Sequence, residues 1–343
     1  MANRDAFREL QGNETVKSTL MGFTDRNAFP NSLLISGPEG SGKTTVARLA
    51  SLAIACQSGG ARPCLTCEAC RKIASEISPD VITISIPKDR RTIGVDAVRE
   101  IRESAYIKPN DLSVKIYVIR DAEKMTEQAQ NALLKLFEEP PHGVYFLLLT
   151  SDVNALLPTV RSRAPELRCE LFDHPTMERL LTANSKKAEI LLKNDPAAFH
   201  RILHAAGGSY GYALRQIEGR SKKTEKGFTT VEAALKALSA SDKPGLLLLL
   251  LGEASERDAF SDFLRLLSTA MRDMTASRRC DTVPELLFFP DENAASEAAA
   301  SFTLPALLRL HHELERLSGQ ISDYNVNLRT AAILTANRLW ELK

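Results

Sequence analysis

The stretch GPEGSGKTT, residues 37–45, has the residue types and spacing that hold a phosphate chain. It fits the pattern G-x-x-x-x-G-K-[ST], with an apolar run before it and a helical pattern after it. Glycines let backbone N–H groups curl around a phosphate, to which the next helix presents its positive end. The alternative is a glycine-rich turn with a chance lysine. The predicted contacts are Gly37, Gly40, Gly42, Lys43, Thr44 and Thr45.

Binding a nucleotide and hydrolysing it require different residues. Lys43 can reach the β- and γ-phosphate oxygens and Thr44 can bind Mg²⁺, but hydrolysis also needs an acid on the Mg²⁺ shell. Asp121 follows the apolar run KIYVIR (115–120) and is a candidate metal ligand, with a helix N-cap as the alternative. Ala122 comes next. Glu123 is a carboxylate, but the alternation of side chains along an extended backbone predicts that it points elsewhere.

Four of the six cysteines fall within fifteen residues, as Cys56-x7-Cys64-x2-Cys67-x2-Cys70. In a reducing compartment such clustering indicates a metal site rather than disulfides. Four thiolates close a tetrahedral shell and leave no position for a substrate, which favours structural Zn²⁺. A redox pair and an iron–sulfur cluster remain as alternatives.

The whole chain has 343 residues, 44% hydrophobic and 25% charged, which is typical of two or three globular domains. A net charge of +1 excludes a global electrostatic attraction to nucleic acid, so any DNA contact must be local or shared with partners. The N-terminus lacks a signal-peptide core, and the run Leu246–Leu251 is too short to span a bilayer. These features predict a cytoplasmic protein without membrane contact.

Residues 1–170 have an α/β pattern, with four apolar runs separated by helical patterns, which predicts a parallel sheet with flanking helices. The runs are 32–36, 81–86, 115–120 and 145–150. Residues 171–220 predict a small helical lid, and the charged segment 219–227 an interdomain linker. Residues 228–343 predict an all-α domain, since apolar residues recur at three- and four-residue spacing from Phe260 to Met274.

The order of these motifs resembles a known family. The phosphate loop, the cysteine insert at 56–70 and the Asp-ended run, together with NALLKLFEEPP (131–141) and LLPTVRSRAPELR (156–168), are similar to the AAA+ subunits of the bacterial DNA polymerase III clamp loader. The stretch from Asp323 to Leu342 is similar to the family's Asn-x-Asn segment in its helical collar. The resemblance therefore implies an AAA+ P-loop domain, a lid and a collar used for oligomerisation.

Two departures separate this chain from the family's gamma/tau motor subunit. That branch has Asp-Glu where this chain has Asp121-Ala122, and a Gly-Ser-x-Arg arginine in the lid where this chain has Gly211. Both departures remove hydrolysis machinery and resemble the delta-prime subunit, as does the pattern of residues 79–101. The intact phosphate loop does not distinguish the gamma/tau subunit from the delta-prime subunit.

The family's Ser-Arg-Cys motif corresponds here to Ser162-Arg163-Ala164. The resemblance implies that Arg163 reaches a neighbouring subunit's γ-phosphate as an arginine finger; a solvated or salt-bridged arginine is the alternative. Thr150 and Ser151 are candidates for the polar residue that senses γ-phosphate, with a strand-end cap as the alternative. A basic loop with Lys88, Arg90 and Arg91 could touch a phosphate backbone, but solvated side chains are the more ordinary interpretation.

The resemblance implies a delta-prime-like subunit that helps load the sliding clamp onto primed DNA during replication. Its cofactors would be ATP or ADP with Mg²⁺, and structural Zn²⁺. Its partners would be gamma/tau and delta-type subunits in a hetero-pentamer, the sliding clamp and DNA. It would belong to the DNA-directed DNA polymerase III holoenzyme, a nucleotidyltransferase, with little or no ATPase of its own. The rivals are a gamma/tau-type catalytic ATPase and a P-loop regulator outside replication.

Overall fold

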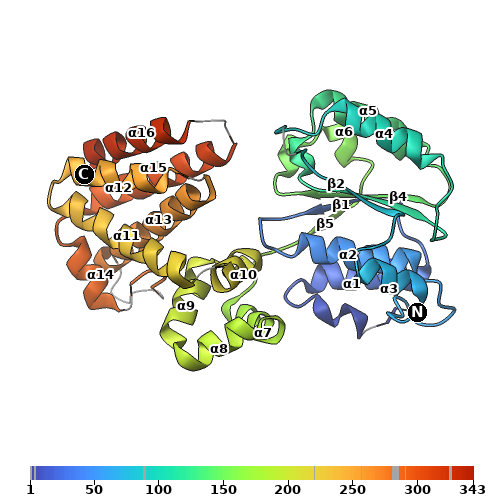
Figure 1. Cartoon of the computed structure of the whole chain (residues 1–343), viewed down its shortest axis with the longest axis horizontal. Coiled ribbons are helices and arrows are strands. Elements are labelled where there is room, and N and C mark those ends of the chain that lie inside the picture. Colours follow the sequence, from blue (N-terminus) through green and yellow to red (C-terminus); the bar gives the residue numbers. More distant parts are fainter. Residues whose placement is uncertain are drawn as a thin grey trace. The chain divides into compact units, whose positions relative to one another are not determined.

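The structure is a computed structural model, and Figure 1 traces the chain through an α/β part and a helical part. The residues that it describes are 2–3, 5–87, 90–219, 221–255, 257–279, 286–289, 291–323 and 327–343. They divide into two compact units. The first comprises Met1–Leu180 with Gly208–Gly211, and the second Leu181–Gly207 with Tyr212–Lys343.

The first unit is built on a five-stranded sheet in the order β2-β3-β4-β1-β5, and every neighbouring pair is parallel. The predicted parallel sheet is therefore confirmed. β2 ends two residues before the apolar run that predicted it, and the edge strand β5 was not predicted as a strand. The strands are β1 Ser32–Ser36, β2 Val81–Ile84, β3 Lys115–Ile119, β4 Val144–Thr150 and β5 Glu166–Arg168.

Alternating side chains of the central strands pack into two hydrophobic cores, one on each face of the sheet. On β1, Leu33 and Ile35 pack into one core, while Leu34 packs into the other. On β4, Leu147 and Leu149 face the first core, and Phe146 and Leu148 the second. This burial on both sides explains why the strands are continuous apolar runs, as parallel strands covered on both faces usually are.

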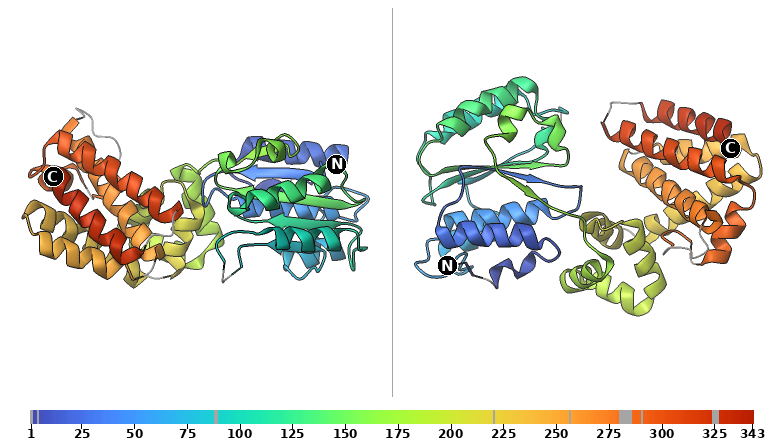
Figure 2. Two further views of the ribbon diagram at one scale, coloured as in Figure 1. Left: turned by 90° about the horizontal axis from the view of Figure 1, so that it is seen from above. Right: turned by 180° about the vertical axis from the view of Figure 1, so that it is seen from behind.

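Helices cover both faces of the sheet (Figures 1 and 2). One face carries α1 Glu14–Arg26, α2 Lys43–Ala55 and α3 Glu68–Ala74; the other carries α4 Val95–Ala105, α5 Glu127–Glu138 and α6 Pro158–Arg161. Three short 3₁₀ turns, Ala6–Glu9, Ala122–Lys124 and Val153–Ala155, complete the connections.

The second unit is helical throughout its described elements, as predicted for the C-terminal part. α7 (His174–Asn184) leads into it. The following helices are α8 Lys186–Asn194, α9 Pro196–Ala205, α10 Tyr210–Gly219, α11 Ser221–Ser239, α12 Lys243–Glu253, α13 Arg257–Arg279, α14 Glu292–Ala299, α15 Leu304–Asp323 and α16 Leu328–Leu342. In the family's Asn-x-Asn segment, Asn325 lies outside the described residues. Asn327 caps α16, because its side chain accepts from the N–H groups of Arg329 and Thr330.

The linker prediction for residues 219–227 was wrong. α10 ends at Gly219 and α11 already begins at Ser221. Farther along α11, Val231, Ala234 and Leu238 are buried at helical spacing, so the helix is anchored in a core that the polar segment alone does not reveal. Lysine and glutamate are good helix formers and extend the helix toward its N-terminus. The structure also assigns most of the predicted lid, 171–220, to the helical unit.

No helix among the described ranges is long and apolar enough to cross a membrane.

A buried carboxylate organises the connection that leads into β3. The side chain of Asp80 is 0% exposed and accepts hydrogen bonds from the backbone N–H groups of Asn110, Asp111 and Leu112, at 2.7, 2.6 and 2.8 Å. Burial alone would raise the pKa of Asp80, but these three N–H groups and the charge of Lys115 hold it below its usual value. The carboxylate therefore stabilises this connection in its ionised form.

We expect Asp80→Asn to lower the free energy of unfolding by about 1.5–3 kcal/mol at pH 7, because charge-assisted hydrogen bonds are lost. Since the folded pKa is depressed, this stabilisation is complete above the unfolded pKa of about 3.9 and disappears as pH falls through the folded pKa. Urea unfolding at pH 7 and at about pH 3 measures it. Asp111→Asn, which breaks only the exposed ion pair with Lys72, is the control. If Asp80→Asn lowers the free energy of unfolding as much at pH 3 as at pH 7, this account is contradicted.

Candidate nucleotide and metal sites

The phosphate loop occupies residues 37–42, between the end of β1 and the first residue of α2. Gly37 and Gly40 have φ angles of 144° and 80°, in the region that favours glycine. A Cβ on Gly37 would collide with the carbonyl oxygen of Cys169, and one on Gly40 with the hydroxyl of Ser209. The two positions therefore need glycine both for backbone conformation and for close packing.

Lys43 is the first residue of α2, and its side chain folds back over the loop. Its Nζ donates to the carbonyl oxygens of Gly37 at 2.6 Å and Pro38 at 2.9 Å. Burial lowers the pKa of Lys43, and nearby carboxylates oppose that effect, Glu123 most strongly. Thr44 is exposed and Thr45 half-buried at the start of the same helix. The loop thus brings its cation and both hydroxyls to the end of β1.

The segment after β3 does not continue as an extended strand. Asp121 is exposed, with φ 52° and ψ 48°, and its side chain makes no capping hydrogen bond to the 3₁₀ turn that follows. Ala122 is 0% exposed, so its side chain faces the core. Glu123 instead meets the end of β4, where its carboxylate accepts from both the N–H and the hydroxyl of Ser151.

The prediction that Glu123 points away was wrong. Side chains alternate between two sides only within an extended strand, and β3 ends at Ile119. Asp121 has a left-handed backbone and a 3₁₀ turn follows it, so the side chains after β3 no longer alternate. Glu123 acts more strongly on Lys43 than Asp121 does.

Thr150, at the end of β4, is fully buried. Its carbonyl accepts from the N–H of Gly37 at 3.1 Å, and its hydroxyl donates to the carbonyl of Asp152 at 2.9 Å. The hydroxyl therefore serves a local turn in this structure, as the strand-end alternative predicted. Ser151, immediately after it, is exposed and bonded to Glu123.

The segment Gly208–Gly211, which belongs to the first unit, packs against the phosphate loop. The N–H of Tyr210 donates to the carbonyl of Gly40 at 3.1 Å. The ring of Tyr210 meets Phe172 edge to face, with centroids 6.5 Å apart. Gly211, at the end of this segment, carries no side chain to the site.

Arg163 follows α6 and is bound within its own chain. Its Nη2 forms an ion pair with Glu138 at 2.6 Å, and its Nη1 donates to the carbonyl of Thr159 at 3.0 Å. The side chain retains 36% of its exposure. An ion pair of this kind is what the alternative of a salt-bridged arginine predicted, although the sequence did not name the partner. Among the described residues, three of the guanidinium's five N–H donors meet Glu138, Thr159 and Ser162.

The predicted basic loop offers little further support for a DNA contact. Lys88 lies outside the described residues. Arg90 is 3.7 Å from Asp96, and both side chains are mostly exposed.

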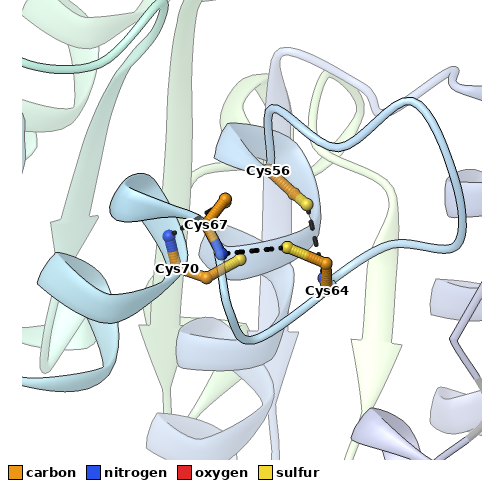
Figure 3. Close-up of side chains that lie close together, drawn as sticks. All are labelled: Cys56, Cys64, Cys67 and Cys70. Carbon is orange, nitrogen blue, oxygen red and sulfur yellow. Dashed lines mark hydrogen bonds between the residues drawn. The ribbon is translucent and has the colours of Figure 1, made fainter.

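The four clustered cysteines come together at the end of α2, as Figure 3 shows. Cys56 follows the last residue of the helix, Cys64 and Cys67 lie in the loop, and Cys70 is in α3. Their sulfur atoms all lie within 4.8 Å of one another. Thiolates about 2.3 Å from one zinc ion would be about 3.8 Å apart, so this donor set fits a tetrahedral zinc site after a small contraction.

Backbone N–H groups point at the sulfurs and favour thiolates. The N–H groups of Cys64 and Cys67 donate to the sulfurs of Cys56 and Cys64, at 3.3 and 3.2 Å. Burial opposes ionisation of Cys64, yet the N–H groups of Cys67 and Thr66 lower its pKa to about 6. Burial raises the pKa of Cys70. A cation would be needed to ionise all four thiols.

One residue of this site had no chemical signature in the sequence. Asn13 is 6% exposed; its Nδ2 donates to the carbonyl of Ser41 in the phosphate loop at 3.3 Å, and its Oδ1 accepts from the N–H of Glu170 at 2.7 Å. An asparagine before a helical pattern indicates a cap, but this side chain forms no cap bond. It ties the loop to the segment that follows β5.

Comparison with known proteins finds a family match in the α/β part. The family model described as DNA polymerase III, delta subunit, matches residues 12–172. The gamma/tau subunit of Mycobacterium tuberculosis is 29% identical over 238 residues, 69% of this chain and 41% of that protein. The tau subunit of Bacillus subtilis is 33% identical over 168 residues, 49% of this chain and 28% of that protein. The chain thus spans about two fifths of the first relative's length.

Two solved structures from Thermotoga maritima are also similar. A DNA polymerase III gamma subunit-related protein has a TM-score of 0.44 at 19% identity, covering 96% of this chain and 100% of that one. The RuvB Holliday junction branch migration motor has a TM-score of 0.43 at 17% identity, covering 90% and 88%. The fold class expected from the sequence, an AAA+ α/β domain followed by helices, is confirmed by the parallel sheet and its strand order.

We expect mass spectrometry of the native protein to find one zinc ion per chain. Cys70→Ser should lose most of that zinc and unfold at a lower temperature, because a buried hydroxyl is a poor substitute for a thiolate ligand. Cys169→Ser, a buried thiol outside the cluster, is the control and should keep its zinc. A folded wild-type chain without metal would refute the zinc assignment.

Proposed function

We propose that this chain, whose residues 12–172 match the family model described as DNA polymerase III, delta subunit, is a delta-prime-like subunit of the bacterial clamp loader. It would help to load the sliding clamp onto primed DNA. Its partners would be gamma/tau and delta-type subunits in a hetero-pentamer that works in the cytoplasm. The assembled subunits together would contact DNA, because a chain with a net charge of +1 has no overall electrostatic attraction to it.

The observation that carries the proposal is a complete phosphate loop without a complete hydrolytic centre. In support, Lys43 folds over the loop and donates to the carbonyl of Gly37, and Gly37, Gly40 and Gly42 have the positive φ angles that such a loop requires. Ala122, at the motor branch's glutamate position, is buried, and Gly211 replaces the lid arginine. The chain would therefore bind ATP or ADP with Mg²⁺ at Thr44 and turn it over slowly or not at all.

The catalytic contribution of the chain would be Arg163, offered to the nucleotide of a neighbouring subunit. In support, the guanidinium is partly exposed and keeps two N–H donors after its contacts with Glu138, Thr159 and Ser162. A guanidinium delivered to a γ-phosphate stabilises the charge that develops in the transition state.

The second candidate is a gamma/tau-type ATPase motor. It is favoured by the complete phosphate loop and by the identity to gamma/tau relatives. It requires this chain alone to hydrolyse ATP rapidly.

Lys43→Ala should weaken binding of ATP and ADP at least about tenfold, since a charge-assisted hydrogen bond contributes about 1.5–3 kcal/mol. Calorimetric titration of the purified chain measures the affinities. In parallel, wild-type protein with primed DNA and clamp should turn over ATP barely above background. Robust turnover that Lys43→Ala abolishes would establish the motor instead.

In the reconstituted loader, Arg163→Ala should reduce clamp-dependent ATP turnover, because an arginine finger accelerates the site it serves about 10³–10⁵-fold. Arg161→Ala, which changes a neighbouring arginine in α6, is the matched control and should leave the turnover unchanged. If Arg163→Ala assembles normally and the loader keeps its full turnover, the chain supplies no finger.

A further inference from the structure

Asn13 lies directly before α1, at a position where an asparagine side chain usually caps the helix. Here the side chain makes no cap hydrogen bond. Its two ends instead bind two distant stretches of backbone. Nδ2 donates to the carbonyl of Ser41 in the phosphate loop at 3.3 Å, and Oδ1 accepts from the N–H of Glu170 at 2.7 Å. The side chain therefore forgoes a local contact and joins two segments that are far apart in the sequence.

An amide side chain is needed to make both contacts at once. The carbonyl of Ser41 requires a donor, whereas the N–H of Glu170 requires an acceptor, and an ionised carboxylate of the same shape offers acceptors alone. Asn13 is 6% exposed, so both bonds are largely shielded from water. A buried backbone group that loses its partner is costly, which makes the two bonds a firm restraint on the loop.

The bond to Ser41 fixes the orientation of the peptide unit between Ser41 and Gly42. In a planar trans peptide the carbonyl and the following N–H point in opposite directions, so the N–H of Gly42 points away from Asn13. Gly42 has a φ angle of 91°, and glycine adopts positive and negative φ about equally readily. This peptide unit would therefore rotate at little cost without a bond from outside the loop. Asn13 supplies that bond.

The preceding peptide unit of the loop is held as well. The N–H of Tyr210 donates to the carbonyl of Gly40 at 3.1 Å, and the N–H of Ser41, in the same peptide unit, donates to the carbonyl of Pro38 at 3.2 Å. Two successive carbonyls are thus bound from outside the loop. The next N–H along the chain, that of Gly42, lies at the N-terminal end of α2, where backbone N–H groups attract a phosphate.

We propose that Asn13 is a positioning residue of the nucleotide site. By holding the carbonyl of Ser41, it directs the N–H of Gly42 at the β-phosphate of a bound nucleotide. The inference rests on the proposed nucleotide binding and names a residue outside the loop on which that binding depends. The N–H groups of a phosphate loop hold the α- and β-phosphates, and a donor that is already oriented avoids the cost of ordering it when the ligand arrives.

The affinities of the full-length chain for ADP and AMP, measured by competition with a fluorescent ADP analogue, test this. The two ligands differ by the β-phosphate, so the ratio of their affinities reports its contribution. Asn13→Ala should weaken ADP binding about three- to tenfold and AMP binding less than about twofold. Asn31→Ala is the matched control: it removes a similar bond, from Nδ2 to the carbonyl of Val144 at 3.0 Å, and should keep the wild-type ratio.

Asn13→Ser is a second variant that keeps the experiment decisive if Asn13→Ala folds poorly. Serine suits the N-cap of α1, but its shorter side chain does not reach Ser41, so the ratio should fall while circular dichroism shows the wild-type fold. An unchanged ratio in a folded Asn13 variant would overturn the inference and leave nucleotide binding intact. Equal weakening of ADP and AMP would overturn it too, because the β-phosphate would then gain nothing from Asn13. If wild type binds no ADP, the proposed nucleotide site is wrong and the inference fails with it.

Discussion

The pairing of β1 between β4 and β5 is the constraint on which the candidate nucleotide site depends. Because the three strands are parallel, their carboxyl ends meet at one edge, where Ser36 lies opposite both Thr150 and Arg168. The N–H of Gly37 continues this pairing one residue beyond the strand by donating to Thr150. The phosphate loop, the Ser151–Glu123 pair and the segment after β5 are thereby fixed to one another, which is the usual place of a ligand site in an open α/β sheet.

The same helix connects the nucleotide site to the cysteine cluster. α2 begins with Lys43 and is followed directly by Cys56, and much of its surface is buried against the sheet. Close-packed interiors have low compressibility and transmit strain, so a displacement at one end of α2 is carried to its other end. Closing the four-cysteine loop at one end would therefore also restrain the end that carries the phosphate loop.

Most of the fold was predictable where one local pattern is sufficient. The buried strands are continuous apolar runs, and β1 has the bounds that its sequence predicted. β5 was missed because three residues, only one of them buried, leave almost no periodicity. The polar start of α11 was mistaken for a linker because its anchor lies farther along the helix, at Val231 and Leu238. For the site, the loop residues and cysteines were predicted, while Asn13 and the direction of Glu123 were not.

The sequence by itself determined the chemistry that this chain offers: a glycine-rich loop with one lysine, four thiols at close spacing, and an alanine directly after Asp121. These depend on residue type and on separations of a few residues, which the backbone fixes locally. Only the tertiary structure decided which charges meet. Glu123 lies against Ser151, twenty-eight residues away, and Arg163 against Glu138, twenty-five residues away, because strand pairing and a reset of the backbone after β3 bring them together. Electrostatic effects fall with distance in space rather than along the chain, so they could not be inferred from the order of the residues.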